Sequence, residues 1–292
     1  MIDRYLLRYF LAVVDHGQFS KAAAAAGVSQ PTLSIGIARL EELLGARLFV
    51  RNNQGVKLTE SGTRFLGHAR QIEQAFNLAE GSVGEIGEAP LVRIGVVSTV
   101  PAGLIAAVLA ARDAEGRERL AFVDGSPNDL ASKLDRGRID IAITLRQPGA
   151  DRFGHETLIE EGYVMALPPG HSLADAGIVP GEAFRDDVML VRRHCEALAQ
   201  TSRYFVERGV RPHFAYRTTD DARASTLVQA GLGVTVMPSM SAVAVGRVAL
   251  AGFDLRRDVG LQYAAHARGM ADSGSGIVRA IRSLAGWDGI AG

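Results

Sequence analysis

The sequence predicts an α/β protein in three parts: a small helical N-terminal domain, one long helix, and a larger body of alternating strands and helices. Three observations carry this prediction. Two helical patterns meet at a glycine within residues 18–44, apolar residues recur in heptads over 65–86, and β-branched runs alternate with helical patterns after residue 90. The chain has 292 residues, of which 47% are hydrophobic, so it can bury a sizeable core.

Residues 18–44 are typical of two helices joined by a tight turn. Ser20 is expected to cap the first helix by accepting a backbone N–H bond. Gly27 supplies the turn. Ser29 is expected to cap the second helix, and Pro31 falls in the first helical turn, where its missing N–H costs little.

The second helix has two faces. One face carries apolar residues at helical spacing, which are expected to pack on the first helix: Leu33, Ile37, Leu40 and Leu44. The other carries hydroxyls, an amide and small apolar groups, which can hydrogen-bond base edges and touch thymine methyls in a major groove. We expect the DNA-contacting residues of this helix to be Ser29, Gln30, Pro31, Thr32, Ser34, Ile35, Ala38 and Arg39.

A short hairpin follows the second helix. Residues 52–55, Asn-Asn-Gln-Gly, separate two short apolar runs, as in a β-hairpin. Arg51 and Lys57 stand on its two arms, where they could clamp phosphates and fix the register of the helix on DNA. Each piece alone also fits an ordinary helical hairpin and a β-turn with solvated charges. The ordered combination favours a DNA-binding domain.

The run AAAAAGVSQPTLSIGIARLEELLGARLFVRNNQGVKLTESG, residues 22–62, resembles the winged helix-turn-helix of LysR-type transcriptional regulators nearly end to end. The later sequence resembles the same family. The resemblance implies a sequence-specific regulator that binds operator DNA, responds to a small-molecule inducer, forms homodimers and homotetramers, and contacts RNA polymerase. The sequence departs from the family at Ile35 and Gly36, where polar or basic side chains are more frequent. Gly36 is expected to loosen the helix by about 1 kcal/mol relative to alanine.

The resemblance and the residue patterns together give the expected domain limits. They are a winged helix-turn-helix domain at 1–58, a linker and dimerisation helix with a hinge at 59–88, and an effector-binding domain at 89–292. The last is expected to be bilobed and periplasmic-binding-protein-like, with subdomains at 91–162 plus 266–292 and at 163–265. The whole chain has no net charge, and residues 1–60 hold seven basic and five acidic residues, or +2. One such head would bind DNA weakly, so useful affinity requires at least a dimer.

A heptad pattern follows Thr59, which is a candidate N-cap. Apolar residues at alternating steps of four and three form the pattern: Phe65, Ala69, Ile72, Phe76, Ala79, Val83 and Ile86. The alternative is a helix lying against its own domain, but the narrow stripe favours self-association. Glycines at 81, 84 and 87 and then Pro90 predict a hinge after the helix.

The body contains short strands followed by helices, beginning at 91–97 with LVRIGVV and resuming at 188–191 with VMLV. This pattern predicts two parallel α/β lobes, with crossings near 145–165 and 245–265. Such lobes bind small molecules at the carboxyl ends of their strands, and N–H groups at helix starts favour an anion there. We expect the effector site to be edged by Ser98, Thr99, Ser126, Thr144, Arg146, Arg193, His194 and Cys195.

Each of these residues has a plainer interpretation. The hydroxyls also fit helix caps, and the arginines also fit surface charges. Cys195 beside His194 suggests a nucleophile, but adjacent residues on a strand end point to opposite sides. A small, partly buried hydrophobe lining the cleft is therefore the favoured interpretation of Cys195.

No catalytic or metal-binding motif is present: the sequence has no G-x-S-x-G, Walker loop, dinucleotide fingerprint or metal-ligand cluster. We therefore expect no enzyme activity, catalytic residue, metal or cofactor. The single cysteine fits a reducing cytoplasm, and the absence of a long apolar run or export signal predicts no membrane segment. An enzyme on the α/β body and a plain solute-binding protein remain the alternatives, and the N-terminal head is a poor fit for the latter.

Overall fold

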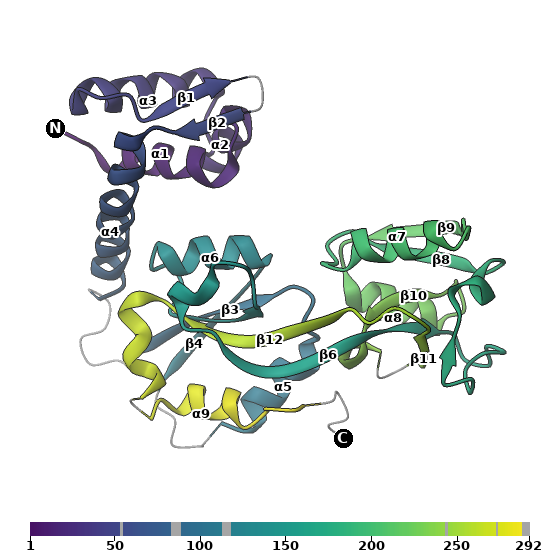
Figure 1. The fold of residues 1–292 in the computed structure, drawn as a ribbon. Coiled ribbons are helices and arrows are strands. Elements are labelled where there is room, and N and C mark those ends of the chain that lie inside the picture. Colours follow the sequence, from purple (N-terminus) through teal and green to yellow (C-terminus); the bar gives the residue numbers. More distant parts are fainter. Residues whose placement is uncertain (53–54, 83–88, 113–117, 243–244, 273, 288–292) are drawn as a thin grey trace. The chain divides into compact units, whose positions relative to one another are not determined.

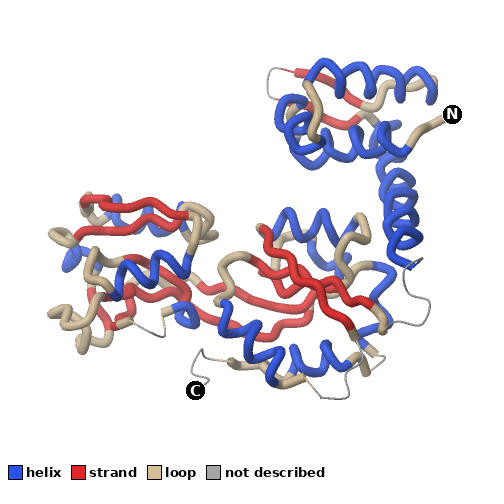
Figure 2. The backbone as a smooth tube through the Cα atoms, turned by 180° about the vertical axis from the view of Figure 1, so that it is seen from behind, coloured by secondary structure: helices blue, strands red, loops and turns tan. Residues whose placement is uncertain are grey.

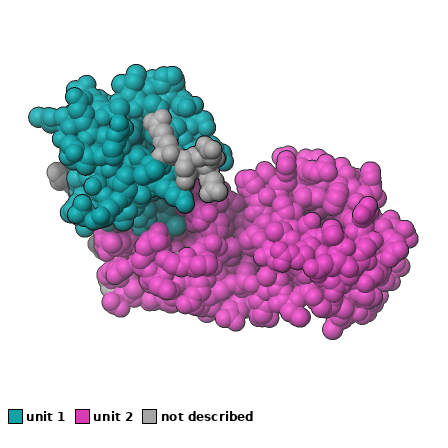
Figure 3. Space-filling view, turned by 45° about the horizontal axis from the view of Figure 1, so that its top comes forward, with its two compact units in different colours: residues 1–89, 131–139 teal, residues 90–130, 140–292 magenta. Residues whose placement is uncertain are grey.

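The structure is a computed structural model that describes residues 1–52, 55–82, 89–112, 118–242, 245–272 and 274–287 (Figures 1 and 2). Its chain forms two compact units (Figure 3). The first consists of residues 1–89 with 131–139, and the second of residues 90–130 with 140–292. Within the described residues, no helix has the length and apolar character needed to cross a membrane.

The first unit begins with three helices: α1 (Arg4–His16), α2 (Phe19–Ala26) and α3 (Gln30–Leu44). Ser29 caps α3 as predicted, because its Oγ accepts the Thr32 N–H at 3.2 Å. Gly27 provides the turn in the left-handed conformation, with φ of 69°. The predicted cap at Ser20 is wrong: α2 begins one residue earlier, at Phe19, whose ring is buried in the core of this unit.

A two-stranded antiparallel wing follows, made of β1 (Phe49–Asn52) and β2 (Gly55–Leu58). The long helix α4 (Glu60–Ser82) begins directly after it. Thr59 caps this helix as predicted, because its Oγ1 accepts the Gly62 N–H at 2.9 Å. The same hydroxyl donates to the Arg47 carbonyl at 2.7 Å, which fixes the start of α4 to the start of the wing.

The heptad seam of α4 has two parts. Phe65 packs on Phe10 with ring centres 5.1 Å apart, and Ala69 is fully buried in the same core. These two predicted dimerisation residues therefore stabilise their own domain, which was the alternative interpretation of the stripe. Further along, Ile72, Phe76 and Ala79 are exposed. Val83 and Ile86 lie outside the described residues.

Gly62 marks the closest approach of α4 to the wing. A β-carbon at this position would lie 2.1 Å from the carbonyl oxygen of Leu48, and a backbone atom cannot be rotated away. We expect Gly62→Ala to lower the free energy of unfolding of this unit by about 1–3 kcal/mol. Urea unfolding followed by circular dichroism measures the change.

Gly67→Ala is the matched control for this variant. Gly67 lies in the same helix, and nothing is within 4 Å of its β-carbon position. This change is expected to be neutral or to stabilise by up to about 1 kcal/mol. Equal stability of the two variants would contradict the close contact.

The second unit has two lobes. Lobe I is built on three parallel strands, which confirm the predicted parallel α/β pattern. Its elements are β3 (Leu91–Val97), α5 (Ala102–Ala110), β4 (Arg119–Gly125), β5 (Ile141–Leu145) and α9 (Gly276–Arg282). Helix α6 (Pro127–Asp135) begins in this unit, and its residues from 131 onward belong to the first unit. Lobe II holds the parallel pair β8 and β9. Its elements are β7 (Ile178–Val179), β8 (Val188–Arg192), α7 (Leu198–Glu207), β9 (His213–Thr218), α8 (Asp221–Gln229), β10 (Thr235–Pro238) and β11 (Gly246–Leu250). Short 3-10 helices join these elements: η1 (Ala150–Phe153), η2 (Gly181–Phe184), η3 (Ser239–Ser241) and η4 (Ala265–Ala271).

Two long neighbouring strands connect the lobes, β6 (Glu156–Leu167) and β12 (Arg256–Tyr263) (Figure 1). The first half of β6 pairs with β12, and its second half pairs with β10 and β11 of lobe II. The largest sheet thus has the order β4-β3-β5-β12-β6-β11-β7. The second crossing strand, β12, lies within the expected range of 245–265, and it pairs with β5 of lobe I over Val259–Tyr263.

Candidate DNA-binding surface and effector pockets

The outward face of α3 presents the predicted DNA-contacting residues. Ser29 and the residues from Gln30 to Thr32 are exposed, as are Ala38 and Arg39, while Ser34 is half-buried. Ile35 is 70% exposed, so this face also presents a large apolar side chain to the solvent. The opposite residues Leu33, Ile37 and Leu40 are buried in the core, as predicted.

The two predicted wing residues lie on opposite strands of the hairpin. Lys57 is exposed on β2, and Arg51 lies in β1 opposite Val56. Lys57 is thus accessible on the wing, and its contact with a phosphate stays a prediction.

Gly36 has a role that the sequence did not suggest. It is buried, and a β-carbon there would lie 2.6 Å from the Cδ2 atom of Tyr9. The glycine therefore allows the aromatic ring of α1 to pack directly on α3. The expected loosening of the helix is one effect of Gly36, and close packing of the two helices is the other.

Glu41 connects the recognition helix to the wing. It is 9% exposed, and its Oε1 atom accepts the backbone N–H groups of Leu48 at 2.7 Å and Phe49 at 3.2 Å. A carboxylate that satisfies two backbone donors at a strand start fixes the wing relative to α3. This role of Glu41 was not predicted from the sequence. Its signal is an acid one turn after Ile37, on the buried face of an amphipathic helix.

Ile35 provides the sharpest test of this surface. We expect Ile35→Glu to abolish specific DNA binding, because it places a negative charge where α3 would meet the phosphates and base edges, while the high exposure leaves stability nearly unchanged. Gel-shift titration and thermal unfolding measure the two effects. Gly67→Glu adds the same charge on α4, away from α3, and should retain most of the affinity. Full binding by Ile35→Glu would show that DNA contacts another surface.

The centre of the second unit holds a buried arginine, Arg257, on β12. Its side chain is 3% exposed, and its Nε donates to Glu161 Oε1 at 2.8 Å. Its Nη1 donates to Thr99 Oγ1 at 2.9 Å and to Glu196 Oε1 at 2.7 Å. Thr99 belongs to lobe I and Glu196 to lobe II. One guanidinium therefore joins the two lobes.

The charges of this network stabilise one another. Burial opposes the charge on Arg257, but Glu161 and Glu196 outweigh it and raise the pKa of the guanidinium. Burial also opposes ionisation of Glu196, but Arg257 and the hydroxyl of Tyr163, 2.7 Å away, outweigh it and lower the pKa of that carboxyl. Both shifts favour the charged forms of Arg257 and Glu196.

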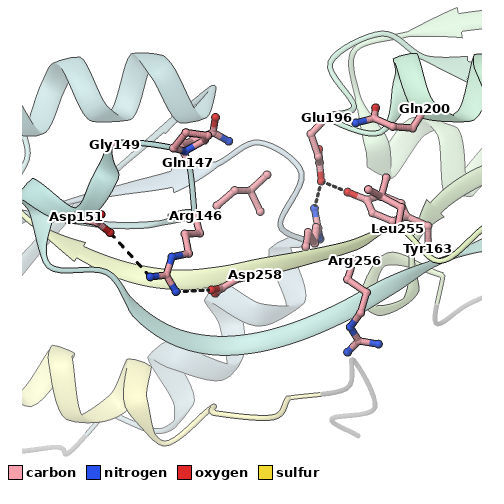
Figure 4. A pocket seen from close by; sticks show the side chains of 13 residues that line it. Arg146, Gln147, Gly149, Asp151, Tyr163, Glu196, Gln200, Leu255, Arg256 and Asp258 are labelled. Atoms are coloured by element: carbon pink, nitrogen blue, oxygen red, sulfur yellow. Dashed lines mark hydrogen bonds and ion pairs between the residues drawn. The ribbon is translucent and has the colours of Figure 1, made fainter.

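A pocket of about 580 Å³ lies beside this network, between the lobes (Figure 4). Lobe I contributes the loop after β5, lobe II contributes the residues at the start of α7, and the crossing strands form the floor. The lining residues are Leu145, Arg146, Gln147, Pro148, Gly149, Asp151, Tyr163, Glu196, Gln200, Leu255, Arg256, Arg257 and Asp258.

Arg146 is a lining cation whose two carboxylate partners both lie far from it. It lies 3.7 Å from Asp258 and 3.9 Å from Asp151, both too long for a hydrogen bond. Asp258 is already engaged, because His155 lies 2.9 Å from one of its oxygens and Thr157 donates to the other at 2.8 Å. The donors of Arg146 therefore remain available to an anion.

Only Arg146, among the predicted effector residues, lines this pocket. Thr99 is held by Arg257 instead. Ser126 caps α6 through the Asp129 N–H, which is the helix-cap interpretation, and Ser98 donates to the Gly125 carbonyl. The remaining predicted residues also lie elsewhere. Thr144 is buried, and its Oγ1 atom has no hydrogen-bond partner among the described residues. Arg193 and His194 are exposed, and Cys195 lines a different pocket.

Four lining residues were not predicted from the sequence: Tyr163, Glu196, Gln200 and Arg257. Tyr163 lies on β6, which was not predicted as a strand, although Tyr163–Leu167 is a continuous apolar run. Arg257 belongs to a pair of arginines, and no local pattern in the sequence predicts that it is buried. Among the described residues, no group of His, Cys, Asp and Glu is arranged to hold a metal ion.

The fold and these sites define a winged helix-turn-helix domain linked to a bilobed α/β ligand-binding domain. The family model described as "Bacterial regulatory helix-turn-helix protein, lysR family" matches residues 5–63, and the one described as "LysR substrate binding domain" matches residues 86–272. The chain therefore belongs to the LysR family. It is a DNA-binding transcriptional regulator with an effector-binding domain.

Its relatives are regulators. A "Probable hydrogen peroxide-inducible genes activator" of Mycobacterium avium is 35% identical over 85% of this chain and 82% of its own. The regulator AlsR of Bacillus subtilis is 32% identical over 80% of this chain and 79% of its own length. In fold, the chain is similar to a full-length OxyR variant of Pseudomonas aeruginosa, with a TM-score of 0.58, 23% identity, and 98% and 97% of the two chains covered. It is also similar to full-length BenM, with a TM-score of 0.53, 23% identity, and 97% and 96% covered.

Proposed function

We propose that this regulator responds to a small organic carboxylate that Arg146 holds in the pocket between the lobes. The observation that carries the proposal is a guanidinium in a pocket whose carboxylates are engaged with other donors or lie at more than 3.5 Å. A guanidinium with available donors binds a carboxylate through two parallel, charge-assisted hydrogen bonds. The volume of about 580 Å³ lies within the range of small-molecule sites.

The lining also limits the rest of the ligand. Tyr163, Leu145 and Leu255 offer apolar surface, while the amides of Gln147 and Gln200 offer donors and acceptors on opposite sides. A carboxylate with a compact aromatic or hydroxylated body fits this mixture. No step of this binding requires catalysis, a metal or a cofactor.

Binding between two lobes provides the link to regulation. A ligand that contacts both lobes favours the lobe arrangement that it fits best, which shifts the population of the domain. Exposed Ile72, Phe76 and Ala79 on α4 support pairing of this helix with a second copy. We propose a homodimer built on α4, assembling further into a homotetramer. It would act in the cytoplasm on an operator in double-stranded DNA and communicate with RNA polymerase.

Arg146→Gln tests the anchoring role. We expect carboxylates that raise the melting temperature of the full-length protein, in a panel that includes benzoate, to bind the variant at least about tenfold more weakly, because a charge-assisted bond is lost. Affinity for DNA should be unchanged. Arg185→Gln, an exposed residue of lobe II that does not line the pocket, is the control. If a carboxylate raised the melting temperature of Arg146→Gln as much as that of the unchanged protein, the proposal would be contradicted.

A second candidate function is a response to hydrogen peroxide, which the names of several relatives state for those proteins. One observation favours it: the Sγ atom of Cys195 accepts a hydrogen bond from Nη1 of the buried Arg192 guanidinium, at a distance of 3.3 Å. A peroxide would be reduced to water as the thiolate gains an S–O bond and becomes a sulfenic acid. Burial acts in the opposite direction by raising the pKa of this thiol, which lowers the fraction of reactive thiolate. The chain has one cysteine, so an intrachain disulfide cannot follow.

Mass spectrometry separates the two candidates. If the natural inducer is a carboxylate, treatment with equimolar hydrogen peroxide for several minutes should leave Cys195 unmodified. DNA binding should also be unchanged. A rapid gain of one oxygen at Cys195, with an altered DNA footprint that Cys195→Ala abolishes, would favour the peroxide response instead.

A further inference from the structure

Lobe II contains a second pocket, of about 720 Å³, between α7 and the strands β8 and β9. Its walls are mainly apolar: Leu190, Leu198, Phe205, Val206, Val210 and Phe214 line it. Three of these side chains are exposed although they are large and apolar: Leu198 by 36%, Phe214 by 43% and Val206 by 67%. Apolar groups gathered around one concave site are typical of a ligand-binding surface.

A β-bulge in β9 directs a cation toward this pocket. Met189 of β8 pairs with Phe214, whereas the next residue, Leu190, pairs with Tyr216, so β9 carries one extra residue. Side chains three positions apart on a regular strand point to opposite faces, but the bulge brings Phe214 and Arg217 to the same face. Their contact confirms this, because the Arg217 guanidinium lies 5.7 Å from the centre of the Phe214 ring.

The charges around the pocket do not cancel. Its lining acid, Glu196, is engaged with Arg257 and Tyr163. Arg192, at the base, pairs with Asp221, with 2.7 Å between Nε and Oδ1. Arg211 and Arg217 also line the pocket, and neither has a carboxylate partner among the residues that the structure describes. The result is an apolar pocket with uncompensated positive charge at its rim.

We propose that this pocket is a second ligand site and binds an amphipathic monocarboxylate. The carboxylate pairs with Arg217, and the hydrocarbon part packs between Phe214 and the α7 residues Phe205 and Val206. An anion is favoured over a neutral ligand because the arginine charge has no protein carboxylate to offset it. A volume of about 720 Å³ suits a small molecule with a chain of roughly eight carbons.

The two sites share one wall. Glu196, just before α7, lines both this pocket and the one between the lobes. It also accepts the hydrogen bond from Arg257 that joins the two lobes. A ligand under α7 therefore adjoins the residue on which the lobe contact depends. The second site does not require that the first bind a carboxylate.

Isothermal titration of the full-length protein with octanoate tests the second site, with octanamide as the uncharged analogue. We expect saturable octanoate binding and at least tenfold weaker octanamide binding. Arg217→Gln and Val206→Asp should each weaken octanoate at least tenfold, because one removes the cation and the other places a carboxylate beside the hydrocarbon chain. Val206 is mostly exposed, so its variant should fold. Arg203→Gln, on the exposed side of α7 and outside the lining, should bind as the unchanged protein does.

Arg146→Gln distinguishes the two pockets. It should leave octanoate binding intact if octanoate lies under α7. Loss of binding in Arg146→Gln with retention in Arg217→Gln would place octanoate between the lobes and overturn the second site. So would the absence of saturable binding, or equal affinity of the unchanged protein, Arg217→Gln and Val206→Asp.

Discussion

The buried guanidinium of Arg257 is the interaction on which the effector-binding domain depends. It sits on a crossing strand, is 3% exposed, and bonds Thr99 of lobe I and Glu196 of lobe II. A buried charge is costly unless its partners are complete, and here Glu161 completes the set. Removing either lobe's partner would leave part of that charge unpaired. The pocket between the lobes lies directly beside this contact, so a ligand there meets the group that sets the distance between the lobes.

The DNA-binding domain depends on a different constraint, close packing at small residues. Gly36 admits the ring of Tyr9, and Gly62 admits the carbonyl of Leu48. Glu41 then satisfies the first backbone donors of the wing. Together these contacts fix α3, the wing and α4 with respect to one another, so that the exposed face around Ile35 is held rigidly. A rigid reading surface keeps base contacts in register once phosphate contacts have positioned the domain.

The sequence predicted those features that periodicity and local chemistry determine. The two faces of α3, the caps at Ser29 and Thr59, and the parallel strands of both lobes are confirmed. Features set by contacts distant in sequence could not be predicted. Ser126 satisfies a helix start, and Thr99 is bound by an arginine 158 residues away. The length of β6 was not predicted because its acids Glu160 and Glu161 interrupt the apolar residues of the strand, and Glu161 is buried against Arg257. A strand that changes partners halfway has no simple period in its sequence.

A double-mutant cycle between Thr99→Val and Glu196→Gln tests most directly whether one guanidinium couples the lobes. The free energy of unfolding of the effector-binding domain is measured for each single variant, the double variant and the unchanged protein. Because Thr99 and Glu196 share Arg257, the two effects should differ from additivity by at least about 0.5 kcal/mol, and the difference should vanish in an Arg257→Met background. Additive effects within about 0.3 kcal/mol in the presence of Arg257 would contradict the coupling.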